Sequence, residues 1–172
     1  MGAHACICAI VIAACGVRPA AQGELIERTL ALVGGEAITL SDVRGALALG
    51  LVDVPAAADQ IPAATKRLID RALMLREVER YTPAEPALAD VDARLEAMRE
   101  RFASADAARA ALASAGRSEA LVRAWLRDDL RIEAYLQQRF AAAESAERRA
   151  ELITDWISDL RRRTPVVELV KD

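Results

Sequence analysis

Two short apolar runs near the start of the chain, Thr29–Val33 and Ala37–Leu40, flank the pair Gly34-Gly35. The apolar positions in these runs alternate as they do in half-buried strands. A Gly-Gly loop supplies the positive φ angles that a tight hairpin needs. The pattern therefore predicts a β-hairpin.

The end of this hairpin carries the signals of a helix start. Thr39 or Ser41 can cap a helix through its side-chain oxygen, and Asp42 would lie in the first turn, where a negative charge is favourable. Gly50 is suited to end the same helix. We therefore expect a short helix over about residues 42–50.

From residue 63 onward, apolar residues recur every three or four positions, which is the spacing along one face of an α-helix. Proline, glycine and serine residues interrupt the pattern at the points where helices would end or begin. The periodicity predicts helices at about residues 63–81, 88–102, 104–116, 118–140 and 144–163.

The same spacing assigns an apolar face to each of the longer helices. The clearest face comprises Leu88, Val91, Leu95, Met98 and Phe102. The long helix is expected to bury Leu121, Trp125, Ile132 and Leu136. The last helix is expected to bury Leu152, Ile153, Trp156, Ile157 and Leu160.

A β-branched run, VVELV at residues 166–170, follows Pro165, which stops the last helix. The run is too short to be a stable helix. A two-stranded hairpin is marginal in water by itself, so the N-terminal hairpin needs a further strand. We therefore expect residues 166–170 to pair with it. This gives a mainly α fold with a small antiparallel sheet, formed by the N-terminal hairpin and the C-terminal strand.

Residues 1–23 have features of an export signal. The apolar run at residues 5–15 is followed by Ala21 and Gly23, which place small residues before a cut at Glu24. Signal peptidase requires small residues at these positions. One interpretation is therefore a signal peptide that is removed from the mature chain.

Two other interpretations of this leader stay open. The tetrapeptide Ile12-Ala13-Ala14-Cys15 resembles a lipobox, in which Cys15 would be lipidated. The leading MGAH has no Lys or Arg, so a buried N-terminal strand or helix is the alternative to export. Export by either route predicts a periplasmic location. It leaves one domain over residues 24–172, with the hairpin and helices within 24–140 and the closing helix and strand within 144–170.

The composition favours helices that pack through thin contacts. Hydrophobic residues make up 53% of the chain and aromatic residues only 3%, and many of the hydrophobic residues are alanine. The formal net charge is −3, so the chain lacks the basic field that nucleic-acid binding needs. No apolar run approaches the roughly 20 residues of a membrane-spanning helix. We therefore expect neither a nucleic-acid partner nor a membrane span.

Catalytic chemistry has few residues to use beyond the leader. The cysteines are Cys6, Cys8 and Cys15, and the one histidine is His4, so a chain without its leader has no Cys or His for a nucleophile–base pair. Gly34-Gly35 is not followed by the Lys-Ser/Thr of a phosphate-binding loop. We expect no catalytic residue, no cofactor and no metal site.

Two charged groups are interpreted as solvated surface. Asp128-Asp129 is an adjacent acidic pair, which is more typical of an exposed helix face than of a metal site. Arg161, Arg162 and Arg163 lie at the end of the last predicted helix, where positive charge suits the helix dipole.

The stretch ELIERTLALVGGEAITLSDV opens a series of motifs in a characteristic order. ATKRLIDRALMLREVER, DVDARLEAMRERFAS, ALASAGRSEALVRAWLRDDLRIEAYLQQRF and DWISDLRRRTPVVELV follow it. In this order they resemble the SurA-type periplasmic chaperones and related parvulin-linked foldases, over about residues 24–170. The resemblance implies a helical chaperone domain whose C-terminal helix and strand fold back onto the N-terminal part.

The chain departs from that family in one large respect. Typical members carry one or two parvulin isomerase domains between the long helix and the C-terminal helix. Each takes about 90–100 residues, a normal size for a small domain, whereas only a few residues, near 141–145, separate those helices here. Parvulin sites also use histidines, which residues 24–172 lack. The resemblance therefore implies a chaperone without prolyl isomerase activity.

Because we expect no catalytic site, a binding surface is the remaining basis for a function. Adaptable or amphipathic side chains can line a groove for unfolded chains, and the candidates are Met74, Met98, Phe102, Trp125 and Tyr135. Ordinary core packing is the alternative for each, and the preferred one for Phe102 and Trp125.

The resemblance predicts an exported, ATP-independent chaperone that binds unfolded or nascent envelope polypeptides, including outer-membrane precursors. Two other functions stay open at this point. One is a helical adaptor or lipoprotein that binds a single folded envelope partner. The other is a protein related to peptidyl-prolyl isomerases by family only.

Overall fold

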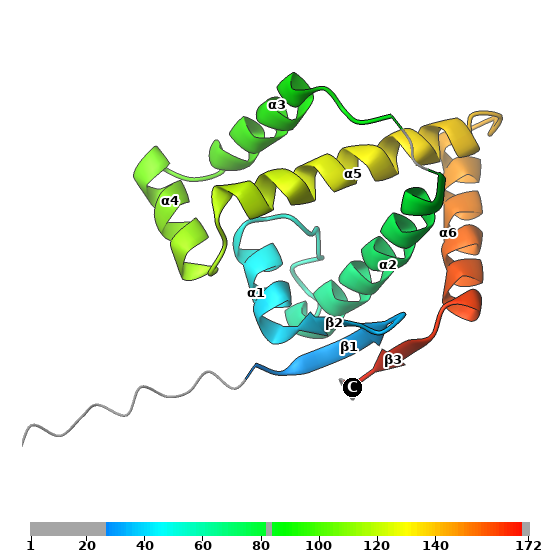
Figure 1. Ribbon diagram of the computed structural model, residues 1–172, viewed down its shortest axis with the longest axis horizontal. Helices are drawn as coiled ribbons and strands as arrows, with labels where there is room; N and C mark the ends of the chain where they lie inside the picture. The colour runs from blue at the N-terminus through cyan, green and yellow to red at the C-terminus, as the bar shows by residue number, and fades with distance from the viewer. Residues whose placement is uncertain (1–26, 82–83, 170–172) are drawn as a thin grey trace, which may run out of the picture.

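The computed structural model describes residues 27–81 and 84–169 (Figure 1). This part of the chain is mainly helical, with a small sheet at one side. In order, the elements are β1 (Thr29–Val33), β2 (Glu36–Thr39), α1 (Leu40–Ala48), α2 (Gln60–Tyr81), α3 (Leu88–Arg99), α4 (Ala105–Ser114), α5 (Glu119–Arg139), α6 (Ala146–Arg163) and β3 (Val166–Glu168).

The strands form one antiparallel sheet in the order β2-β1-β3, which confirms the expected pairing between the two ends of the chain. Gly34 and Gly35 join β1 to β2 with φ angles of 57° and 93°, a conformation that glycine adopts without steric cost. β3 lies along the other edge of β1, with Leu32 opposite Val167. Figure 1 shows α6 running from the end of α5 back to this strand.

Contacts beyond the strand register fix β3 in place. The Gly34 amide donates to the Pro165 carbonyl at 2.8 Å, and the Leu169 amide donates to the Leu30 carbonyl at 2.8 Å. Arg161 of α6 also takes part, and this corrects its interpretation as a solvated helix end. Its guanidinium donates to Asp70 of α2 at 2.7 and 2.9 Å and to Glu168 of β3 at 3.3 Å. A side chain at the end of α6 therefore holds a strand and a second helix together.

A capping box begins α1 at the end of β2. The Asp42 amide donates to the Thr39 hydroxyl at 3.2 Å, and the Thr39 amide donates to the Asp42 carboxylate at 2.9 Å. Thr39, and not Ser41, is therefore the cap. Asp42 also pairs with Arg117, which lies in the turn between α4 and α5. Burial alone would raise the pKa of Asp42, but the hydrogen bonds from Thr39 and Arg117 outweigh it and lower that pKa below its ordinary value of 3.8.

This lowered pKa predicts how stability depends on pH. A carboxyl whose pKa is lower in the folded state stabilises the fold above its unfolded-state pKa, and that contribution is lost as the pH falls through the folded-state pKa. We expect Asp42→Asn to lower the free energy of unfolding by about 1–2 kcal/mol at neutral pH. The difference from wild type should shrink as the pH falls below the ordinary carboxyl pKa, and it should close once the pH is below the folded-state pKa of Asp42. Urea denaturation across this range measures it, and a difference that does not vary with pH would contradict the assignment.

The first core lies between the sheet, α1, α2, α6 and the C-terminal half of α5. α2 crosses this core, and Ile69, Leu73 and Val78 are almost fully buried there. The burial of these apolar side chains contributes to the driving force that holds the sheet against the helices. The other buried members include Leu30, Ala31, Val33, Ile38, Val43, Leu68, Ile132, Tyr135, Trp156 and Leu160.

A second core joins α3, α4 and the N-terminal half of α5. Leu49, from the end of α1, is buried with them, and Leu51 packs against both cores. α5 therefore runs through both halves of the molecule (Figure 1). The buried members of the second core are Leu49, Val91, Leu95, Met98, Leu112, Val122 and Leu126.

Two expected core residues are exposed. The side chain of Leu88 is 82% exposed at the first position of α3, and that of Leu121 is 54% exposed in the first turn of α5. In the N-terminal half of α5 the buried positions are Val122 and Leu126, each one residue after an expected position, whereas the expected Ile132 is buried in the C-terminal half. Periodicity defines a face only to within about one position of the 3.6-residue turn, and it does not say how far the partner helix extends.

Helix α2 begins at Gln60, three residues before the expected start. Pro62 thus lies inside its first turn, where the missing amide hydrogen has no partner to lose. Within the described part of the chain, no helix combines the length and the apolar character needed to cross a membrane.

Candidate functional site

A cleft of about 570 Å³ opens where α3 ends, α4 runs past it and α5 begins. We refer to it as the α3–α4 cleft. Its lining combines alanine and larger apolar residues with five charged side chains. The residues are Glu96, Arg99, Glu100, Phe102, Ser104, Ala105, Ala108, Arg109, Leu112 and Glu119.

Local signals in the sequence place the three helices around this cleft. Ser104 has an extended backbone, and its hydroxyl accepts a hydrogen bond from the Ala107 amide at 3.1 Å, which begins α4. Gly116 follows α4 with a φ angle of 62°, and the Ser118 hydroxyl caps α5 in the same way. These turns set the short α4 beside the end of α3 and leave a space between them.

The floor of the cleft is apolar, and two of its four residues are alanines. Ala105, Ala108 and Leu112 lie at helical spacing on one face of α4, and Phe102 comes from the loop before it. Ala108 and Leu112 are buried, whereas Ala105 is exposed. Because alanine fills little volume, the angle between α3 and α4 is not closed by side chains.

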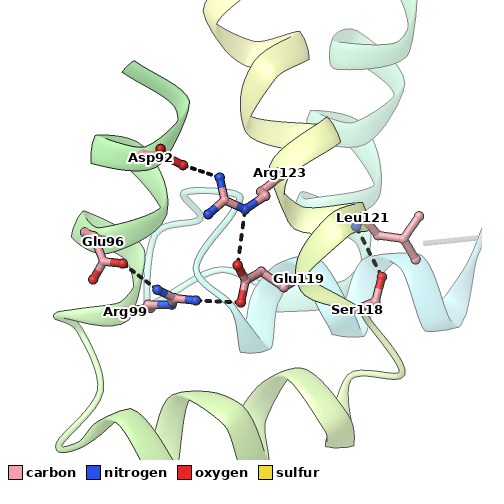
Figure 2. A network of polar contacts seen from close by, with 7 residues as sticks. All are labelled: Asp92, Glu96, Arg99, Ser118, Glu119, Leu121 and Arg123. Atoms are coloured by element: carbon pink, nitrogen blue, oxygen red, sulfur yellow. Dashed lines mark hydrogen bonds and ion pairs between the residues drawn. The ribbon is translucent and has the colours of Figure 1, made fainter. Parts of the chain in front are cut away.

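The rim of the cleft includes Glu96, Arg99 and Glu119, which belong to a chain of ion pairs that connects α3 to α5 (Figure 2). Arg99 of α3 pairs with Glu96 on its own helix and with Glu119 of α5, the latter at 2.6 Å. Glu119 also accepts a hydrogen bond from Arg123 at 3.1 Å, and Arg123 pairs with Asp92. These side chains are partly solvated, so each pair contributes little stability, but the network orients the charges around the opening.

Within residues 27–81 and 84–169, no three His, Cys, Asp or Glu side chains are grouped so as to hold a metal ion. No protein-family model matches this chain, and no curated protein sequence matches it either. The cleft is therefore interpreted from its own residues.

The structure does not bring the five predicted groove residues into one groove. Phe102 is half-buried and lines the α3–α4 cleft, whereas Met98 is buried in the second core, does not line the cleft and has only 3% of its surface exposed. Met74, Trp125 and Tyr135 all belong to or pack against the first core. The five are thus divided between two cores, and Phe102 alone among them faces the cleft.

Trp125 is held beneath an arginine in the first core. The guanidinium of Arg71 lies 3.8 Å from the Trp125 ring centroid and donates to Asp129 at 2.7 Å. Burial raises the pKa of Asp129, and the charge of Arg71 acts in the opposite direction.

Like Asp129, Asp128 forms ion pairs, and its partners are Arg127 and Arg131. The interpretation of the Asp128-Asp129 pair as a solvated surface was therefore wrong, because both side chains are half-buried and connect helices or turns of a helix.

Sequence reasoning missed most of the cleft residues. Ala105, Ala108 and Leu112 form a stripe at helical spacing that has only one bulky member, which is the signal of a helix face that leaves space beside it. The sequence did not indicate that Glu100 lines a cleft, because the chain has many glutamates and only the folded structure shows which residues surround this one.

Proposed function

We propose that this chain is an ATP-independent chaperone that holds unfolded polypeptides, and that it binds them in the α3–α4 cleft. The observation that carries the proposal is an open cleft with an apolar floor, in which four of the five lining charges, those of Glu96, Arg99, Arg109 and Glu119, are already paired. The volume of the cleft lies in the range of ordinary ligand sites. It suits one or two large side chains of an extended segment.

The chemistry of the lining fits weak and unspecific capture. The apolar floor gives a favourable free energy to any large apolar side chain, at about 25 cal/mol per Å² removed from water. Small alanine side chains impose few shape requirements, so different segments can be accepted. The solvated rim limits the dry contact area, so a bound segment can dissociate again.

The resemblance to SurA-type chaperones supports the same proposal. It implies a C-terminal strand that folds back onto an N-terminal hairpin, and β3 pairs with β1 in this way. On the resemblance we propose a periplasmic location, unfolded or nascent envelope polypeptides as partners, and no prolyl isomerisation. The proposed leader over residues 1–23, with cleavage at Glu24 or lipidation of Cys15, falls outside the described residues.

Suppression of aggregation is the experiment that tests the function. A protein that aggregates when heated is mixed with the purified chain, without nucleotide, and light scattering is followed. We expect scattering to fall progressively up to a several-fold molar excess of the chain, since weak binding must be driven by concentration. Unchanged scattering at that excess would contradict the proposal. Recovery of a single stoichiometric folded partner from an envelope extract would favour the adaptor function instead.

A further inference from the structure

The charges that line the α3–α4 cleft are not equally available to a ligand. Arg99 is occupied by Glu96 and Glu119, and Arg109 is occupied by Asp106. Both cationic side chains of the lining therefore already have carboxylate partners. An incoming carboxylate would have to share one of these arginines with a carboxylate that is already bound to it, so it would gain less than it would at an unpaired arginine.

Glu100 is the exception among the acidic side chains of the lining. Glu96 and Glu119 both pair with arginines, whereas Glu100 is exposed and forms no ion pair within residues 27–81 and 84–169. Glu100 is also the C-terminal cap of α3. The negative end of that helix dipole adds to its charge.

The N-terminus of α4 carries a positive partial charge at the same cleft, but neighbouring side chains compensate this charge. Asp106 lies in the first turn of α4, where its carboxylate neutralises the positive end of the helix dipole. The Ser104 hydroxyl accepts one of the free amides there. The lining therefore has one charge without a counter-charge, which is the negative charge of Glu100. Glu100 lies two residues before Phe102, which belongs to the apolar floor.

We propose that the cleft selects polypeptide segments in which Lys or Arg flanks a large apolar side chain. This inference rests on the proposed function and specifies its substrate class. The apolar side chain lies on the floor formed by Phe102, Ala105, Ala108 and Leu112. The neighbouring cation pairs with the Glu100 carboxylate at the mouth of the cleft. Acidic flanks are disfavoured, because they meet Glu100 and find both arginines occupied.

Three soluble fluorescent peptides test the selectivity. They share a Leu-Phe-Leu segment and differ only in its flanks, which are Lys, Gln or Glu. Their affinities for the full chain are measured by fluorescence anisotropy at low salt. An exposed ion pair is worth about 0.2–1 kcal/mol, so wild type should bind the Lys-flanked peptide about 1.4- to 5-fold more tightly than the Gln-flanked one. The Glu-flanked peptide should bind most weakly, and added salt should reduce the differences.

Glu100→Gln is expected to bind the Lys- and Gln-flanked peptides equally, and Glu100→Lys is expected to reverse the order of the Lys- and Glu-flanked peptides. Glu79→Gln is the matched control. Glu79 is exposed on α2, lies outside the cleft and has no ion pair in the described residues, so its variant should keep the wild-type order.

The outcomes separate the two proposals. If wild type binds all three peptides equally, or if Glu100→Gln keeps the wild-type order, the selectivity is refuted and the chaperone function stands. If wild type binds none of the three peptides, both the selectivity and the proposed chaperone function are refuted.

Discussion

Deletion of residues 165–172 is expected to lower the free energy of unfolding by about 3–5 kcal/mol. The deletion removes β3 and its pairing with β1, together with the Gly34–Pro165 and Leu30–Leu169 hydrogen bonds. It also turns β1 into an unprotected edge strand. The almost fully buried side chains of that strand, Leu30, Ala31 and Val33, would lose one side of their cover. Urea denaturation followed by circular dichroism measures the change, and the truncated chain should also aggregate more readily.

A shorter deletion controls for chain length. Removal of residues 170–172 leaves every contact of β3 named above in place, so it should change the free energy of unfolding by less than about 0.5 kcal/mol. If both truncated chains unfold at the same urea concentration as wild type, the strand pairing does not contribute to stability in solution.

The sheet could be predicted from the sequence because its turn and the adjoining helix cap depend on neighbouring residues, and because an isolated hairpin needs a further strand. Gly34-Gly35 specifies a turn with two positive φ angles, and Thr39 with Asp42 specifies a helix start. The third strand followed from Pro165 and from the marginal stability of an isolated hairpin. These features depend on the chemistry of few residues, and the structure has each of them.

The apolar faces of the helices were predicted less well. Leu88 and Leu121 fit the periodicity but are exposed, because the position of the neighbouring helix decides which part of a face is covered. The roles of Arg161 and Asp129 were missed for the same reason. Their partners, Asp70 and Arg71, are distant in the sequence, and only the packing of α2 against α5 and α6 brings them together.

The cleft could not be predicted, because groove residues were chosen by type. Methionine and aromatic side chains suit a binding surface, but they suit a core equally well, and Met98 and Tyr135 are in fact buried. The floor depends instead on alanines, which are common throughout the chain. The spacing of Ala105, Ala108 and Leu112 marks one face of a helix, but it does not show what lies beside that face until α3, α4 and α5 are placed around it.

Ala105→Trp is the second substitution for which we expect a large effect. Ala105 is the exposed first residue of α4 and lines the cleft, so an indole side chain there would occupy the floor without disturbing the second core. We expect the affinity for an unfolded polypeptide to fall at least about tenfold, which corresponds to 1.4 kcal/mol. Ala110→Trp is the matched control, because Ala110 is exposed on the same helix but does not line the cleft. Both variants replace an exposed alanine of α4 with the same residue, so they differ in whether the new side chain lies in the cleft.

The most direct measurement is a binding titration of these proteins with one fluorescent, permanently unfolded polypeptide, such as a reduced and alkylated protein. Circular dichroism first establishes that wild type, Ala105→Trp and Ala110→Trp are equally folded. If the cleft holds unfolded chains, wild type and Ala110→Trp bind within about twofold of each other, and Ala105→Trp binds at least about tenfold more weakly. Equal binding by all three proteins would contradict the assignment of the cleft, and no binding by wild type would contradict the chaperone function itself.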